Sequence, residues 1–111
     1  MYASHVDFVW NAAKSETNLR ERGFDFEFAS LVFAGPTLER EDNRHDYGER
    51  RVLAIGVADG IELVLVFAGR VTGSGQVERR IISARRANRK ERIVYEAAIR
   101  AQEPEPGTRR P

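Results

Sequence analysis

Cysteine is absent from this sequence of 111 residues, and it holds only two histidines. Without cysteine the chain can form neither a disulfide nor a zinc–thiolate centre, and it has no thiol nucleophile. No apolar run approaches the ~20 residues of a membrane-spanning helix, and the N-terminal residues lack the basic start and apolar core of a signal peptide. These absences predict a cytoplasmic protein with no membrane partner.

Acidic residues balance the basic residues over the whole chain, but one segment is strongly basic. The formal net charge is only +1, so total charge offers no long-range attraction for a polyanion. Residues 79–92, RRIISARRANRKER, nevertheless carry seven basic residues and one acidic residue. Every basic residue except Lys90 is arginine, whose planar fork suits bidentate phosphate recognition. Two interpretations stay open here: a solvated surface, or a site for RNA, DNA or an acidic protein segment.

Local signals predict one α+β domain over residues 1–101. A strand at 8–10 precedes a helix at about 12–22, which Asn11 caps and Gly23 ends. Asp25 is placed to cap a second helix, which closes before Gly35-Pro36. Residues 102–111, rich in proline and charge, are expected to be disordered.

The second half of the chain predicts a sheet and a final helix. Strands are expected at 51–57, 61–68 and 77–84, after a polar segment at 37–47 that suits an exposed strand or loop. Asp59-Gly60 is a hairpin signal, and the run IELVLVFA is apolar on both faces, which favours the centre of the sheet. Asn88 and Glu91 form a capping box. The expected order is β-α-α-β-β-β-β-α, with a four-to-five-stranded antiparallel sheet.

The basic strand poses a question of side-chain direction. Strict alternation puts Arg79 and Arg85 on one face and Arg80 and Arg86 on the other. Arg80 and Arg85 can therefore share a site only if the strand twists or bulges between them.

Five short motifs bear on the function of the chain. The first motif has the pattern W-D-x-x-K; Trp10 and Lys14 match it, and Asn11 stands in place of the aspartate. The second motif has the pattern K-H-G, and residues 21–23 of this chain, Glu-Arg-Gly, occupy its position. Complete matches follow to G-E-x-R at 48–51, R-I-I-S-A-R at 80–85 and E-R-x-x-Y at 91–95. With these motifs in order over residues 8–96, the sequence resembles the BrnT family of toxins.

The resemblance implies a RelE-like fold and an endoribonuclease that inhibits translation without a metal or other cofactor. It also implies a BrnA-like antitoxin whose ribbon-helix-helix part binds operator DNA, so that the toxin reaches this DNA only through the antitoxin. The alternative is a catalytically impaired module of the same fold that binds antitoxin or nucleic acid. Arg22 stands where the family has a histidine, and it can supply charge but no proton transfer at neutral pH.

Metal-free RNA cleavage needs a base for the 2′-hydroxyl and cations for the phosphorane. Glu49, inside a matched motif, is the candidate base, and a surface ion pair is its equal alternative. Arg51, Arg80 and Arg85 are the candidate phosphate ligands. Further RNA contacts are expected from seven residues: Lys14, Arg22, Ser83, Arg86, Arg89, Lys90 and Arg92. Solvated side chains are the alternative for Lys14, and a small strand residue is the alternative for Ser83. Isolated histidines and unsuitable Asp spacing predict no metal site.

Overall fold

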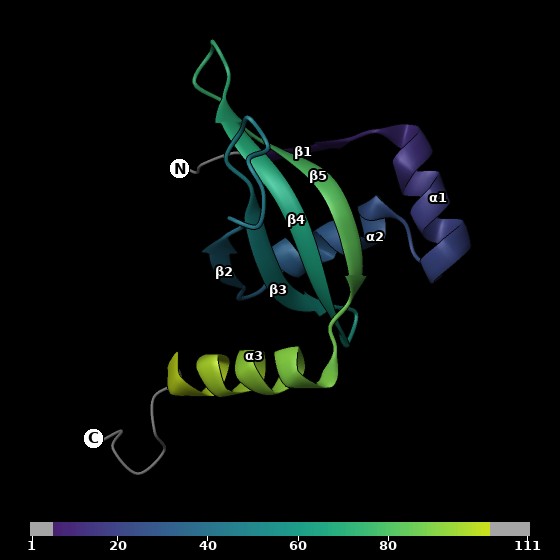
Figure 1. Ribbon diagram of the computed structural model, residues 1–111, viewed down its shortest axis with the longest axis vertical. Coiled ribbons are helices and arrows are strands. Elements are labelled where there is room, and N and C mark those ends of the chain that lie inside the picture. Colours follow the sequence, from purple (N-terminus) through teal and green to yellow (C-terminus); the bar gives the residue numbers. More distant parts are fainter. Residues whose placement is uncertain (1–5, 103–111) are drawn as a thin grey trace.

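The computed structural model describes residues 6–102, which form three α-helices, one 3-10 helix and five strands (Figure 1). The strands are β1 (Val6–Trp10), β2 (Leu38–Glu41), β3 (Val52–Ala58), β4 (Ile61–Val71) and β5 (Val77–Arg86). The helices are α1 (Ala12–Arg22), α2 (Phe26–Ala29), the 3-10 helix η1 (Ser30–Ala34) and α3 (Arg89–Gln102). Gln102, expected in the tail, ends α3. The expectations for residues 1–5 and 103–111 lie outside the described residues.

The helix ends lie where the local sequence signals placed them. Asn11 accepts a hydrogen bond from the Lys14 amide at 3.0 Å, and Gly23 closes α1 with a left-handed φ of 89°. Asp25 caps α2 through the amide of Phe28. The expected second helix is split, because after four α-helical residues the chain tightens into η1 before Gly35.

The sheet has the strand order β1-β5-β4-β3-β2, so the apolar strand β4 is central, as predicted. The α+β class is confirmed, but the sheet is mixed rather than wholly antiparallel. Strands β2 to β5 are antiparallel neighbours, whereas β1 runs parallel to β5 with Val6 opposite Val77. This pairing is possible because the long connection between β1 and β5 lets β1 add to the free edge of β5 in either direction.

The helices cover the two faces of the sheet unequally. Helix α2 and η1 pack on one face, where Leu63, Leu65 and Ile81 are buried against Phe26 and Val32. Figure 1 shows α3 crossing one end of the sheet, away from α1 and α2. Tyr95 fastens α3, since its ring is buried and its hydroxyl donates to the carbonyl of Pro36 at 2.7 Å. We call the face with α2 and η1 the core face and the other the α3 face. None of the described helices is long and apolar enough to cross a membrane.

Candidate active site

A β-bulge in β5 brings Arg80 and Arg85 to the same face of the sheet. Phe67 is opposite Ile81 and Val66 is opposite Ser83, so Ile82 is the extra residue in the ladder. Residues directly opposite one another point to the same face. Arg80 opposite Ala68 and Arg85 opposite Val64 therefore both lie on the α3 face. The bulge answers the question that strict alternation left open.

Glu49 is the centre of an ion-pair cluster formed by the loop before β3 and by β5. One of its carboxylate oxygens accepts from Arg80 Nη2 at 2.7 Å and from Arg51 Nε at 3.2 Å. Arg51 also lies over the ring of Tyr47, with its guanidinium carbon 4.1 Å from the ring centroid. Arg80, and then Arg51, hold the pKa of the Glu49 carboxyl below its usual range, against some opposing desolvation. Glu49 is therefore ionised at neutral pH.

The loop between β2 and β3 contains a buried acid that sequence reasoning missed. The side chain of Asp42 is only 1% exposed and receives a two-point contact from Arg44, at 2.7 and 2.8 Å, and a longer one from the Tyr47 hydroxyl. The Arg44 hydrogen bonds hold the Asp42 pKa far below its usual range. The Asp42 amide donates to the carbonyl of Arg51 at 2.8 Å. Asp42 thus fixes the loop that carries both Arg44 and the Tyr47 ring beneath Arg51.

Arg85 is held at the start of α3 by Glu91. Its two terminal nitrogens donate to the two Glu91 oxygens at 2.9 and 2.8 Å, and this pair lowers the pKa of Glu91 to about 2. Glu91 also accepts from the amide of Asn88, which completes the predicted capping box. Arg85 lines a groove of about 570 Å³ between α3 and the sheet, together with Arg44 and Lys90. The apolar part of this groove comes from Leu38, Leu53, Ile55, Val64 and Val94.

The other predicted RNA contacts are dispersed. Lys14, Arg22 and Ser83 line a shallow groove of about 310 Å³ between α1 and β5. There Arg22 donates to the carbonyl of Ala84 at 2.7 Å, on the part of β5 that extends beyond β1. The Arg22 guanidinium therefore satisfies a backbone carbonyl of β5 that has no partner strand at this edge of the sheet.

Three basic residues lie near the junction of β5 and α3 without joining Arg85. Arg86 is opposite Leu63 and so lies on the core face, near Phe24 and Asp25. Arg92 donates to the carbonyl of Ala87 and lies 3.8 Å from a Glu62 oxygen, and Arg89 is exposed in the first turn of α3. The basic segment is thus divided between two faces.

The cluster on the α3 face has the groups that phosphodiester chemistry uses. Arg51, Arg80 and Arg85 present planar forks, and an ionised carboxylate lies between two of them. The apolar groove beside Arg85 can receive part of a larger ligand. Within residues 6–102, no three His, Cys, Asp or Glu side chains are grouped closely enough to hold a metal ion.

Comparison with known proteins identifies the family. A family model described as a ribonuclease toxin, BrnT, of type II toxin-antitoxin systems matches residues 10–91. A comparison with curated proteins found no match. The matched span includes Glu49 and every arginine of the cluster, and it confirms the resemblance carried by the sequence motifs. Because the match covers most of the sequence, this chain belongs to the BrnT family of ribonuclease toxins from type II toxin-antitoxin systems.

Proposed function

We propose that this chain is an endoribonuclease that cleaves RNA without a metal ion and that its active site is the α3-face cluster. Glu49 is the general base, Arg51 and Arg80 bind the phosphate that is cleaved, and Arg85, whose partner in β4 lies four residues from that of Arg80, binds a neighbouring phosphate. The observation that carries the proposal is the contact of one carboxylate with two arginine forks, at 2.7 and 3.2 Å. The arginines supply the positive charge that a metal ion provides in other nucleases.

The cleavage step uses the RNA's own 2′-hydroxyl as the nucleophile. Glu49 takes the 2′-hydroxyl proton as the oxygen attacks phosphorus, and the P–O5′ bond breaks. The products are a 2′,3′-cyclic phosphate and a 5′-hydroxyl, whose proton comes from solvent. Arg51 and Arg80 stabilise the charge of the phosphorane, which is greatest in the transition state.

Glu49 occupies, in the free protein, the place that a phosphate takes in the complex. When a phosphate binds Arg80, the carboxylate loses its shorter contact at 2.7 Å. Since Arg80 is the main cause of its low pKa, losing that contact moves the pKa of Glu49 back toward its usual range. Substrate binding thus makes Glu49 a stronger base at the point where a base is needed.

RNA is expected to continue from this cluster into the groove beside Arg85. Arg44 and Lys90 line that groove, and Asp42 orients the Arg44 fork. Lys14 and Ser83 are placed for a weaker contact from the α1 side, and Arg89 and Arg92 for contacts with RNA beyond α3. Arg85 exchanges its Glu91 carboxylate for phosphate, as Arg80 exchanges Glu49. Arg86 lies on the core face, and Arg22 satisfies the backbone carbonyl of Ala84 at the open edge of β5, so the proposed RNA site leaves both out.

The inhibitor that this proposal requires is a BrnA-like antitoxin with a ribbon-helix-helix DNA-binding part. The toxin binds operator DNA only through it, and both proteins act in the cytoplasm, where the RNA is translated. A dense set of arginines also attracts the acidic side chains of a protein, so the antitoxin and RNA compete for this surface.

The test is cleavage of a labelled RNA by purified protein in excess EDTA, compared with a Glu49→Gln variant. We expect the wild type to cut RNA and to leave a 2′,3′-cyclic phosphate, and Glu49→Gln to bind RNA but cut it at least 100-fold more slowly. Exposed Glu16→Gln in α1 is the matched control. RNA binding without cleavage by the wild type would support the alternative, a binding module that has lost its chemistry. Cleavage that stops in EDTA would contradict metal independence.

A further inference from the structure

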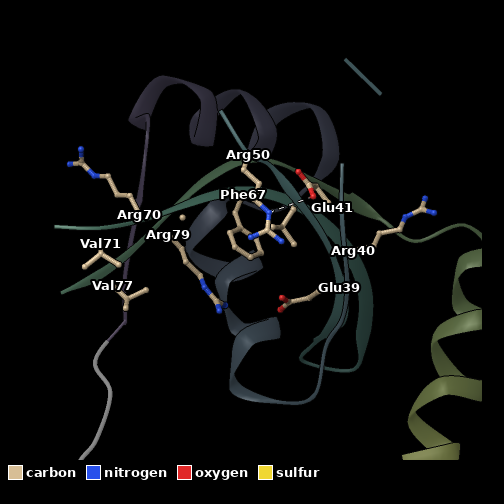
Figure 2. Close-up of a pocket in the computed structure, with 11 residues that line it drawn as sticks. Glu39, Arg40, Glu41, Arg50, Phe67, Arg70, Val71, Val77 and Arg79 are labelled. Atoms are coloured by element: carbon tan, nitrogen blue, oxygen red, sulfur yellow. Dashed lines mark ion pairs between the residues drawn. The ribbon is translucent and has the colours of Figure 1, made fainter. Parts of the chain in front are cut away.

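A third groove lies on the core face, lined by residues of β2, β3, β4 and β5 and by Arg50 in the loop before β3 (Figure 2). It has a volume of about 440 Å³ and crosses four strands. Its apolar part comes from Val52, Phe67, Val71 and Val77, with Gly69 and Arg79 between them. Gly69 is opposite Arg79, and both point away from the face that carries Arg80. The Arg79 end of this core-face groove therefore lies on the opposite face from the proposed RNA site, and the two grooves share only Glu39 and Arg40 of the edge strand β2.

Arg79 is held in place without an anionic partner. Its guanidinium carbon lies 5.0 Å from the centroid of Phe33 and 4.8 Å from that of Phe67, and Phe8 stacks on Phe33. Its guanidinium forms no ion pair or hydrogen bond with any residue between 6 and 102. Figure 2 shows Arg79 beside Phe67, with Arg40 and Arg70 extending away on opposite sides. A half-buried fork on two aromatic rings is a preorganised site for a carboxylate or phosphate.

Gly69 gives this groove its depth. A Cβ at this position would meet only the carbonyl oxygen of Glu78, at 3.8 Å, which is an ordinary contact. The backbone of Gly69 is not in the left-handed region, so neither space nor conformation requires glycine here. Glycine within a strand weakens it and often marks a place where a ligand approaches the backbone closely. The missing side chain leaves room directly beside the Arg79 fork.

The lining favours a peptide over a nucleic acid. Four basic and two acidic side chains line the groove, and the acids, Glu39 and Glu41, both come from the edge strand β2. Arg50 is paired with Glu41 at 3.6 Å and Arg70 with Glu78 at 2.8 Å, which leaves few free cations for the repeated charges of a phosphate backbone. A peptide can place one carboxylate on Arg79 and apolar side chains on Phe67 and Val71.

We infer that an extended segment of the antitoxin, carrying an acidic residue next to an apolar one, docks in the core-face groove. The carboxylate binds the Arg79 fork, and the apolar side chain fills the hollow over Gly69. This inference rests on the proposed antitoxin partner. Arg79 and Arg80 are neighbours in the chain but lie on opposite faces, so this contact adds affinity without using the arginines that bind RNA.

The test measures the affinity of the purified antitoxin, encoded beside the toxin gene, for toxin variants by calorimetry. We expect Gly69→Val and Arg79→Gln each to weaken binding at least 10-fold. Arg86→Gln, on the same face at the other end of β5, should leave it unchanged. Valine suits a strand, so Gly69→Val should fold and cut RNA at the wild-type rate. It should also remain active at an antitoxin concentration that silences the wild type.

A label on the otherwise wild-type protein decides the question even if a variant misfolds. The sequence has no cysteine, so Val71→Cys, at a side chain 69% exposed, takes a single environment-sensitive fluorophore. Antitoxin should change its emission, and a label at Leu19→Cys on α1, 46% exposed, should stay silent. Wild-type antitoxin affinity for Gly69→Val, or a silent Val71 label, overturns the inference. Lost RNA cleavage with unchanged antitoxin affinity would assign the groove to RNA and overturn it too. If the wild type cuts no RNA, the proposed activity fails, while the antitoxin titration still decides the groove.

Discussion

Replacing Arg80 with alanine should remove one phosphate contact and change the salt dependence of RNA binding by a known amount. Each contact with a single strand contributes a slope of about −0.7 to log affinity against log salt. Four contacts, from Arg44, Arg51, Arg80 and Arg85, give a slope of about −2.8, and contacts from Lys90 and the more distant basic residues steepen the slopes of the wild type and the variant by the same amount. Between about 50 and about 200 mM salt, wild-type affinity should then fall about 50-fold. With three contacts the slope is about −2.1, and the affinity of the variant should fall only about 20-fold.

The assay is fluorescence anisotropy with a labelled oligonucleotide. Deoxyribose replaces ribose at each cleavable position, which removes the 2′-hydroxyl nucleophile, so the oligonucleotide binds without being cut. Arg86→Ala is the matched control, because it removes the same charge from the same strand on the opposite face. Its slope should equal that of the wild type. An unchanged slope for Arg80→Ala, or equal flattening for both variants, would refute the assignment of RNA to the α3 face.

Three further predictions concern the scaffold and its pH dependence. Leu65→Ala should lower the free energy of unfolding by about 2–5 kcal/mol, because it leaves a cavity at a fully buried position in the central strand; urea denaturation measures this, and a near-neutral result would contradict it. Asn88→Ala should cost about 1 kcal/mol in the same assay, since its side chain accepts from the Glu91 amide at 2.8 Å, and no change would mean that the cap contributes nothing. The Glu91 carboxyl, with its pKa lowered to about 2, stabilises the fold above the pKa of about 4.3 expected in the unfolded chain. That contribution is lost as the pH falls from about 4.3 through about 2. Over this range the free energy of unfolding should therefore fall less steeply in Glu91→Gln than in the wild type. Parallel curves of unfolding free energy against pH for the two proteins would exclude the Arg85–Glu91 ion pair as the cause of the acid sensitivity.

Features set by a few neighbouring residues could be predicted from the sequence. Asn11 and Gly23 bound α1 because a cap and a left-handed turn depend only on the adjacent backbone. Asp59 and Gly60 both take positive φ and close the β3–β4 hairpin, as an Asp-Gly pair favours. The capping box could be predicted for the same reason, because Asn88 and Glu91 are only three residues apart in the sequence. Burial of β4 could be predicted because its residues are apolar on both faces.

Features that depend on distant partners could not be predicted. The bulge at Ile82 arises from the register between β4 and β5, and it alone decides that Arg80 and Arg85 share a face while Arg86 does not. The parallel pairing of β1 with β5 joins segments about 70 residues apart, with no local signal for direction. Asp42 lies in a polar segment that suggested solvent exposure. Only Arg44 two residues on and Tyr47 five residues on indicated that the acid had partners.

The central claim is that this protein cuts RNA on the α3 face, and the adjacent residues Arg85 and Arg86 test it most directly. Both are arginines in β5, but Arg85 is opposite Val64 on the α3 face and Arg86 is opposite Leu63 on the core face. Single-turnover cleavage of one RNA should be measured for Arg85→Ala and Arg86→Ala at matched folded concentrations. We expect Arg85→Ala to lose at least 100-fold in rate and Arg86→Ala to match the wild type. Equal losses in the two variants, or a loss only in Arg86→Ala, would contradict this active site.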